Sequence, residues 1–265
     1  MTSIEYDAKI ALAIASHKAC PMPPDPIYRP IQVGAAGKQS IGFQRDDEGD
    51  SISDKNKYYC ELTGLYWAWK HFNAEYWGLV HYRRYFKDTL LSMRRGLDGV
   101  MSGAKASKLL ADADVILPYK QIYLIETLES HYAHTHDAND LKVARQVIAD
   151  LCPEYVEDWD CVMRRRSAHM FNMFLMKDEL ASEYCEWMFS ILFELEKRLE
   201  VSGRSDFQSR VYGRISEFLI DVWLNHNNYK YKEVPWVYIG KVDWVRKISS
   251  FIKAKYAGVK YERSF

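Results

Sequence analysis

Two adjacent arginines follow an apolar run in the stretch YWGLVHYRRYF, residues 76–86. The apolar part is typical of a buried strand in an α/β sheet. Ligands of such sheets bind at the carboxyl ends of the strands, and a guanidinium group can hold a phosphate through two parallel hydrogen bonds. We therefore expect His81, Arg83 and Arg84 to bind an anion such as a diphosphate. A solvated turn, or a pair of structural salt bridges, is the alternative reading of the two arginines.

A second polar group follows the first predicted strand, KIALAIASH, residues 9–17. Ser16, His17 and Lys18 stand at its end, and in a parallel sheet they would share one edge with the arginines. The whole chain has 36 basic and 36 acidic residues, so net charge points neither to nucleic acid nor to a strongly acidic partner. Phosphate binding must therefore depend on a local cationic edge.

Two other clusters have residue types that bind metals or substrates. The loop DDEGD offers carboxylates suited to Mg²⁺ or Mn²⁺ at Asp46, Asp47 and Asp50, although such clusters are usually only solvated. We therefore expect no required cofactor, with this loop as the alternative. The histidines of ESHYAHTHD match no zinc spacing, and an acceptor-binding or loop role is expected instead. They are His131, His134 and His136.

A carboxylate with apolar neighbours, Glu217 in GRISEFLIDVWL, is a candidate general base, because apolar surroundings raise the pKa of a carboxyl group. An ion pair with Arg210 or Arg214 is the alternative. The chain has no GxSxG, P-loop or GxGxxG motif, so hydrolase, nucleoside triphosphatase and Rossmann oxidoreductase functions lack their usual support.

The elements that must position these residues alternate between strand and helix in the first half of the chain. Strands are predicted at 9–17, 76–86, 114–119, 169–176 and 229–239, and residues 31–37 are a further strand or a loop. Helices are predicted at 56–72, within 102–113, at 122–134, 140–151, 177–200 and 206–226, with another that starts at Pro153. The proline-rich residues 20–30 predict a loop, since proline cannot donate within a central strand. This order predicts an α/β fold with a mainly parallel central sheet flanked by helices, and a helix-rich C-terminal half.

We expect one domain over residues 1–240 and a basic amphipathic tail over 241–265. The tail has seven basic and two acidic residues, and it would either lie on an anionic membrane surface or pack on the domain. No apolar run approaches the roughly 18 residues of a membrane span, and the N-terminus lacks the features of a signal peptide. The five cysteines form no CxxC pair. A cytoplasmic protein, at most peripheral on the inner membrane face, is therefore expected.

Several segments, in the same order, resemble the bacterial family known as domain of unknown function 4422. They are DSISDKNKYYCELTGLYWAWKHF, YWGLVHYRRYF, HMFNMFLMKDELASEYCEWMFSILFELEK and GRISEFLIDVWL. Members are regarded as glycosyltransferases of capsular and exopolysaccharide gene clusters, some of them galactofuranosyltransferases. The resemblance implies a GT-A-like fold and transfer of a sugar from a nucleotide sugar, with a UDP-sugar expected, to a glycan or lipid-linked oligosaccharide. A non-catalytic carbohydrate-binding component of polysaccharide assembly is the alternative.

The resemblance also implies roles for particular residues. Ordinary GT-A enzymes hold a metal with an Asp-x-Asp motif at the strand end where this chain has HYRRYF, so the arginines would replace the metal against the diphosphate. Lys55 and Asn56, at the start of the early helix, are further donor-binding candidates. An inverting transferase also needs a base for the acceptor hydroxyl group. The candidates are, in order, Glu217, Asp137 and His169.

Overall fold

The computed structural model describes residues 7–89 and 96–240, and the chain divides into two compact units. Unit 1 runs to Tyr119 and also includes Phe171–Glu186 and Tyr229–Ile239, whereas unit 2 includes Lys120–Met170 and Trp187–Asn228. The boundary between Glu186 and Trp187 falls within the long helix α7 (Asp178–Arg198). The predicted tail, residues 241–265, lies outside the described residues.

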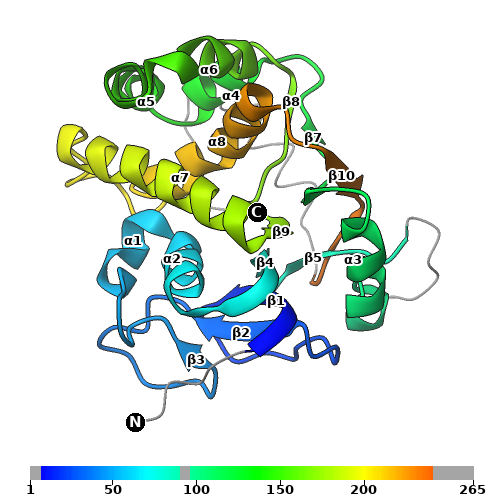
Figure 1. Cartoon of the computed structure of the whole chain (residues 1–265). Helices are drawn as coiled ribbons and strands as arrows, with labels where there is room; N and C mark the ends of the chain where they lie inside the picture. Colours follow the sequence, from blue (N-terminus) through cyan, green and yellow to red (C-terminus); the bar gives the residue numbers. More distant parts are fainter. Residues whose placement is uncertain (1–6, 90–95, 241–265) are drawn as a thin grey trace. The chain divides into compact units, whose positions relative to one another are not determined.

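Unit 1 is built around a mixed sheet, of which nine strands lie in the described residues (Figure 1). β1 (Asp7–Ser16), β2 (Tyr28–Gln32), β3 (Gln44–Arg45), β4 (Asn73–His81), β5 (Arg84–Phe86), β6 (Val115–Pro118), β9 (Phe174–Lys177), β10 (Tyr231–Val234) and β11 (Trp236–Tyr238) form it. The order is β10-β6-β9-β4-β1-β2-β3, and β5 pairs with β4 and β11. The pairs β4–β1, β1–β2, β2–β3 and β6–β10 are parallel, whereas β9 is antiparallel to both neighbours. The α/β fold with a mostly parallel sheet is therefore confirmed.

The central strands are buried on both faces, as expected for a parallel sheet covered by helices. Residues 11–15 of β1 are almost completely inaccessible to solvent. β4 contains Gly78 because a Cβ atom there would lie 1.8 Å from the carbonyl oxygen of Phe174 in the neighbouring strand β9. Ala15 is level with His81 in the β1–β4 register, so the loops after these two strands begin side by side.

Two predicted elements are each divided in the structure. The strand predicted at 76–86 ends at His81, after which Tyr82 and Arg83 form a turn and β5 runs back antiparallel. The helix predicted at 56–72 is split into α1 (Asn56–Tyr59) and α2 (Leu62–His71). Cys60 lies between them with a φ angle of 55°, a conformation that cannot continue a right-handed helix.

The prediction that the whole proline-rich segment is a loop was wrong at its end. β2 begins at Tyr28 and lies between β1 and β3, with Pro30 in register with Ile14 of β1. In the part of the chain that the structure describes, β3 pairs only with Ile31 and Gln32 of β2, so Pro30 has no ladder partner there on that side. This edge-like position is one that tolerates proline.

The remaining elements complete the two units. Unit 1 has η1 (Ser53–Lys55), η2 (Gly96–Gly99) and α3 (Gly103–Leu110). Unit 2 has β7 (Gln121–Ile122), α4 (Leu128–Thr135), α5 (Ala138–Leu151), η3 (Pro153–Tyr155), α6 (Val156–Met163), β8 (Ser167–Ala168) and α8 (Val211–Asn227). Among the residues described, no helix is both long and apolar enough to cross a membrane.

Candidate anion-binding site

The carboxyl ends of β1 and β4 bring basic and aromatic side chains together around Tyr82. The His17 ring meets the Tyr82 ring edge-on with 5.1 Å between centroids, and Lys18 Nζ lies 5.4 Å from the Tyr82 centroid. Arg83 Cζ lies 5.1 Å from the same centroid. Cations placed near the face of an aromatic ring are attracted by its quadrupole. The predicted meeting of the two strand ends is therefore present in unit 1.

The second arginine lies near two other aromatic rings. Arg84 Cζ lies 4.5 Å from the centroid of Phe171 and 5.6 Å from that of Tyr238. The antiparallel pairing of β5 with β11 sets Tyr238 directly opposite Arg84, and the Tyr238 hydroxyl group accepts a hydrogen bond from Arg83 at 3.3 Å. Sequence analysis did not predict this contribution, because Tyr238 is more than 150 positions away along the chain.

We call Lys18, Arg83 and Arg84 the cationic edge. Lys18 and Arg83 are exposed and Arg84 is half-buried. Within residues 7–89 and 96–240, none of the three forms an ion pair with a carboxylate; their side-chain partners are the aromatic rings and a tyrosine hydroxyl group. Aromatic partners orient a cation without neutralising it. The cationic edge can therefore bind a dianion through charge-assisted hydrogen bonds.

Two other predicted residues, Ser16 and His81, make hydrogen bonds that fix the backbone next to this edge. The Ser16 side chain is buried, and its hydroxyl group donates to the Lys18 carbonyl oxygen at 2.7 Å, which fixes the turn after β1. His81 Nε2 lies 2.5 Å from the Phe171 carbonyl oxygen and donates to it. Burial and the nearby Arg84 lower the pKa of His81, against the opposing effects of Glu61 and of the Phe171 hydrogen bond. His81 is therefore a neutral residue that positions Phe171 rather than a third cation.

The backbone beside His81 is strained. Phe171 and Asn172 have φ angles of 79° and 53°, which residues other than glycine rarely adopt. The Asn172 side chain donates to Glu61 at 2.7 Å, and the Phe171 ring also meets Trp236 at 4.9 Å between centroids. Consecutive strained residues persist only where their surroundings hold them, and they concentrate at functional sites.

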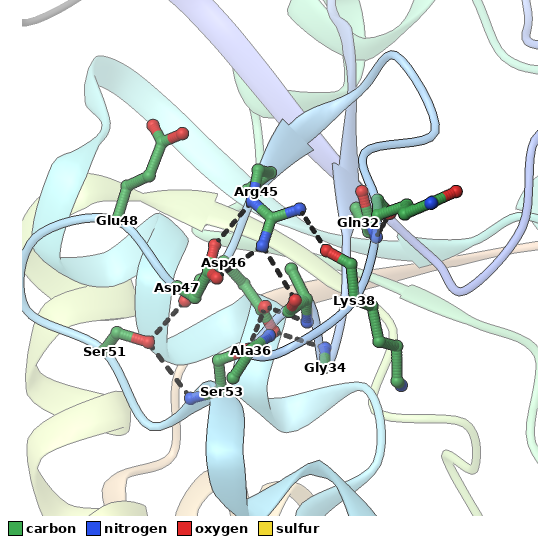
Figure 2. A network of polar contacts seen from close by, with 12 residues as sticks. Gln32, Gly34, Ala36, Lys38, Arg45, Asp46, Asp47, Glu48, Ser51 and Ser53 are labelled. Carbon is green, nitrogen blue, oxygen red and sulfur yellow. Dashed lines mark hydrogen bonds and ion pairs between the residues drawn. The ribbon is translucent and has the colours of Figure 1, made fainter.

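The acidic loop is tied into the structure (Figure 2). The Asp46 side chain is completely buried, and its carboxylate accepts hydrogen bonds from the amides of Gly34 (2.8 Å) and Ala35 (2.9 Å) and from the Ser53 hydroxyl group (2.5 Å). Asp47 pairs with Arg45, whose guanidinium group also donates to the carbonyl oxygens of Ala35 and Lys38. This network fixes the loop that follows β2.

Asp50, another potential metal ligand of this loop, has one side-chain contact in the described residues. Asp50 is exposed and accepts a hydrogen bond from the Tyr66 hydroxyl group at 3.1 Å. In the part of the chain that the structure describes, no three or more His, Cys, Asp or Glu residues form a group able to hold a metal ion.

The two donor-binding candidates of the early helix contact other residues. Asn56 donates from its side-chain amide to the Cys60 carbonyl oxygen at 2.6 Å and to the Thr63 hydroxyl group at 3.0 Å. A Cβ atom at Gly34 would lie 2.5 Å from the Asn56 side chain, so the two residues are tightly packed. Lys55 is half-buried at the end of η1. Asn56 thus ties α1 to α2 and packs on the loop after β2.

Unit 2 separates the three predicted acceptor-binding histidines into two places. His131 and His134 bond through Nδ1 to the two oxygens of Glu126, at 2.9 and 2.8 Å. Burial raises the pKa of Glu126, but the two histidine hydrogen bonds outweigh it and the pKa lies below its usual value. His136 is buried instead, and its Nδ1 lies 3.0 Å from Gln208 Oε1.

The three candidate bases also lie in unit 2, in different surroundings. Asp137 is the N-cap of α5, and its carboxylate accepts from the Asn139 amide at 3.0 Å. Glu217 is half-buried on α8. His169 is buried, and it bonds to the buried Asp221 through both its amide (2.7 Å) and Nδ1 (2.8 Å).

Sequence analysis missed Asp221, although it lies one helical turn after Glu217 in SEFLIDVWL. Its apolar neighbours in the sequence were the available signal. Burial raises the pKa of Asp221, but the hydrogen bonds and charge of His169 outweigh this effect, so the pKa lies below its usual value. A carboxylate that bonds to Nδ1 fixes the orientation and tautomer of an imidazole, as in triads that activate a nucleophile.

The lowered pKa values of Glu126 and Asp221 predict sensitivity to acid. Their contribution to the free energy of unfolding is fully present above the unfolded values, roughly pH 4, and is lost as the pH falls through the folded values. Urea unfolding between pH 6 and pH 3 should therefore show decreasing stability, with a shallower decrease in Asp221→Asn. Glu129→Gln, altered at an exposed carboxylate, is the control. An Asp221→Asn protein with the slope of this control would contradict the prediction.

Comparisons with known proteins extend these observations. A family model described as Domain of unknown function (DUF4422) matches residues 11–228. Among solved structures, the chain is similar to the apo structure of the WbbM bifunctional glycosyltransferase, with a TM-score of 0.81 and 26% sequence identity. The match covers 88% of this chain and 46% of that chain, so this chain spans less than half the length of that protein. No curated protein sequence matches the chain.

Proposed function

Since the chain belongs to the family described as Domain of unknown function (DUF4422), we propose that it is a glycosyltransferase that uses a nucleotide sugar as donor. The family expected from the sequence is confirmed, and the similarity to a bifunctional glycosyltransferase supports glycosyl transfer in general. The observation that carries the proposal is the cationic edge at the carboxyl ends of β1 and β4, where Lys18, Arg83 and Arg84 have no carboxylate partner among the described residues.

The cationic edge would act on the leaving group. When the bond between the sugar and the nucleotide breaks, negative charge develops on the departing diphosphate. Arg84 lies near the rings of Phe171 and Tyr238 and offers planar donors that these contacts help to orient. Arg83 and Lys18 add charge at the same strand ends. Cations that need no reorganisation stabilise this transition state more than the ground state.

Transfer by an inverting route also needs a base that removes the proton of the acceptor hydroxyl group. We retain Glu217, Asp137 and His169 as candidates. His169 has the geometry of an oriented imidazole, because Asp221 holds its Nδ1 and its amide. His131 and His134, at 21% and 43% side-chain exposure, remain the candidates for acceptor contacts.

The finer parts of the proposal concern the substrates, the pathway and the location of the enzyme in the cell. We propose a UDP-sugar donor, a hexosyl or galactofuranosyl group as the sugar transferred, and a glycan or lipid-linked oligosaccharide as acceptor. Capsular polysaccharide, exopolysaccharide or O-antigen synthesis would be the pathway, with the enzyme at the inner face of the cytoplasmic membrane. These assignments rest on the family resemblance in the sequence and not on a contact in the structure.

Thermal unfolding of the full chain with UDP-, GDP-, dTDP- and CMP-linked sugars tests the proposal. A donor present at 100 times its dissociation constant should add about 2.7 kcal/mol to the free energy of unfolding. We expect one nucleotide class to stabilise the protein equally in EDTA and in Mn²⁺, because the cations of the edge belong to the protein. Stabilisation only in Mn²⁺ would indicate that a bound metal ion, and not the cationic edge alone, binds the diphosphate. Glycan binding with no response to any donor would instead support the carbohydrate-binding alternative.

A further inference from the structure

A short segment of unit 2 exposes large apolar side chains in close succession. Ile122, Leu124 and Ile125 are 64%, 82% and 59% exposed. The Leu124 side chain is the most exposed of the three. A single exposed apolar side chain is normal on a protein surface and needs no explanation. Three of them within four positions do, because contiguous exposed apolar patches mark interaction surfaces.

Hydrogen bonds place the exposed Arg166 beside these residues, and Arg164 precedes it by two positions in the chain. Ile122 pairs with Ser167 in the β7–β8 ladder, and the Tyr123 amide donates to the Arg166 carbonyl oxygen at 2.7 Å. The Arg166 guanidinium group in turn donates to the Leu124 carbonyl oxygen at 3.4 Å. Arg164 and Arg166 are both exposed. We call Ile122, Leu124, Ile125, Arg164 and Arg166 the apolar–basic patch.

The described carboxylates near this patch in the sequence are mostly engaged elsewhere. Glu126 is buried and bonds to His131 and His134. Asp160 pairs with Arg145 through two hydrogen bonds of 2.7 and 2.8 Å, and the charge of Arg164 adds to that of Arg145 in lowering the pKa of Asp160. Asp158 accepts from His226 at 2.9 Å. Glu129, on the following helix α4, is exposed. The apolar–basic patch therefore combines protruding apolar groups with positive charge.

We propose that the apolar–basic patch binds the surface of an anionic phospholipid bilayer. Exposed apolar side chains enter the boundary between headgroups and acyl chains, while arginines beside them bind lipid phosphates. The two arginines favour this partner over a neutral apolar one by charge complementarity. The three apolar side chains favour it over a free phosphate, which offers nothing for them to bury against. This membrane contact is separate from the donor-binding proposal and from the predicted tail.

Sedimentation of the full-length protein with vesicles tests this inference. The protein should bind vesicles of phosphatidylcholine with 30% phosphatidylglycerol and should bind pure phosphatidylcholine much less. In Arg164→Gln/Arg166→Gln, the partition coefficient on anionic vesicles should fall roughly fivefold for each arginine removed. In Leu124→Ser/Ile125→Ser it should fall at least about tenfold, because the apolar contribution is lost. All four positions are solvent-accessible, so the variants should melt at the wild-type temperature.

Matched controls separate this patch from other surfaces. Leu151→Ser removes an exposed apolar side chain on α5, and Lys142→Gln/Lys197→Gln removes two exposed charges from unit 2; both should bind vesicles as the wild type does. The inference is wrong if the patch variants bind like these controls. It is also wrong if deletion of residues 241–265 alone abolishes binding, or if the patch variants convert a dimer to a monomer. If the wild-type protein does not bind anionic vesicles, the inference is also wrong.

Discussion

Replacing Arg84 by alanine should reduce kcat for sugar transfer at least a hundredfold, which corresponds to about 3 kcal/mol of transition-state stabilisation. Arg84 has two aromatic rings nearby, those of Phe171 and Tyr238, and its backbone pairs with His81 and Tyr238. Donor binding should weaken less than turnover, since the charge on the diphosphate increases as the bond breaks. Initial rates of nucleoside diphosphate release, over a range of donor concentrations, measure both effects.

Conservative and distant substitutions make this result specific. Arg84→Lys keeps a positive charge but loses the planar donor fork, so its rate should lie between those of Arg84→Ala and the wild type. Arg145→Ala removes an exposed arginine paired with Asp160 in unit 2, and it should leave turnover unchanged. Wild-type turnover by a folded Arg84→Ala protein would show that the diphosphate does not bind at this edge.

The position of the cationic edge could be predicted from the sequence because two local rules apply together. Apolar runs without polar alternation predict strands buried on both faces, and the polar residues that follow such strands lie at one edge of a parallel sheet. The KIALAIASH and YWGLVHYRRYF segments satisfy both rules. The structure accordingly brings His17, Lys18 and Arg83 around Tyr82.

The partners of Arg84 could not be predicted in this way. Tyr238 and Phe171 reach it through the β5–β11 pairing and through the strained backbone at 171–172, and both depend on contacts far apart in the sequence. The strand predicted at 76–86 ran through Tyr82 and Arg83, and a turn at the arginines was only the alternative. Because Tyr85 and Phe86 follow the arginines directly, the apolar residues resume after a short polar interruption, and this pattern does not show that the chain reverses there.

The acidic loop illustrates a different limit of sequence analysis. A run of carboxylates close together is equally compatible with a solvated surface, a metal site or a buried brace, since the residue types are the same in each case. What distinguishes Asp46 is that the amides of Gly34 and Ala35 point at it, together with the Ser53 hydroxyl group. That arrangement depends on the loop after β2 and on the start of η1, which lie on either side of it in the sequence.

Replacing Asp46 by alanine should lower the free energy of unfolding by about 4 kcal/mol, a large part of the stability of an ordinary domain. The substitution removes the acceptor of three hydrogen bonds, and each buried donor left unpaired costs about 1–3 kcal/mol. Some of this cost will be recovered where water reaches the amides of Gly34 and Ala35. Urea unfolding in EDTA measures the change without any contribution from a divalent cation.

Asp50→Ala is the matched control in the same loop. Asp50 is exposed and makes a single hydrogen bond with Tyr66, so its loss should change stability by less than about 1 kcal/mol. If Asp46 is a brace, the deficit of Asp46→Ala should be the same in EDTA and in Mn²⁺, because its oxygens already accept protein hydrogen bonds. An Asp46→Ala protein as stable as the wild type in EDTA, but lacking a stabilisation that Mn²⁺ gives the wild type, would instead establish this loop as the metal site.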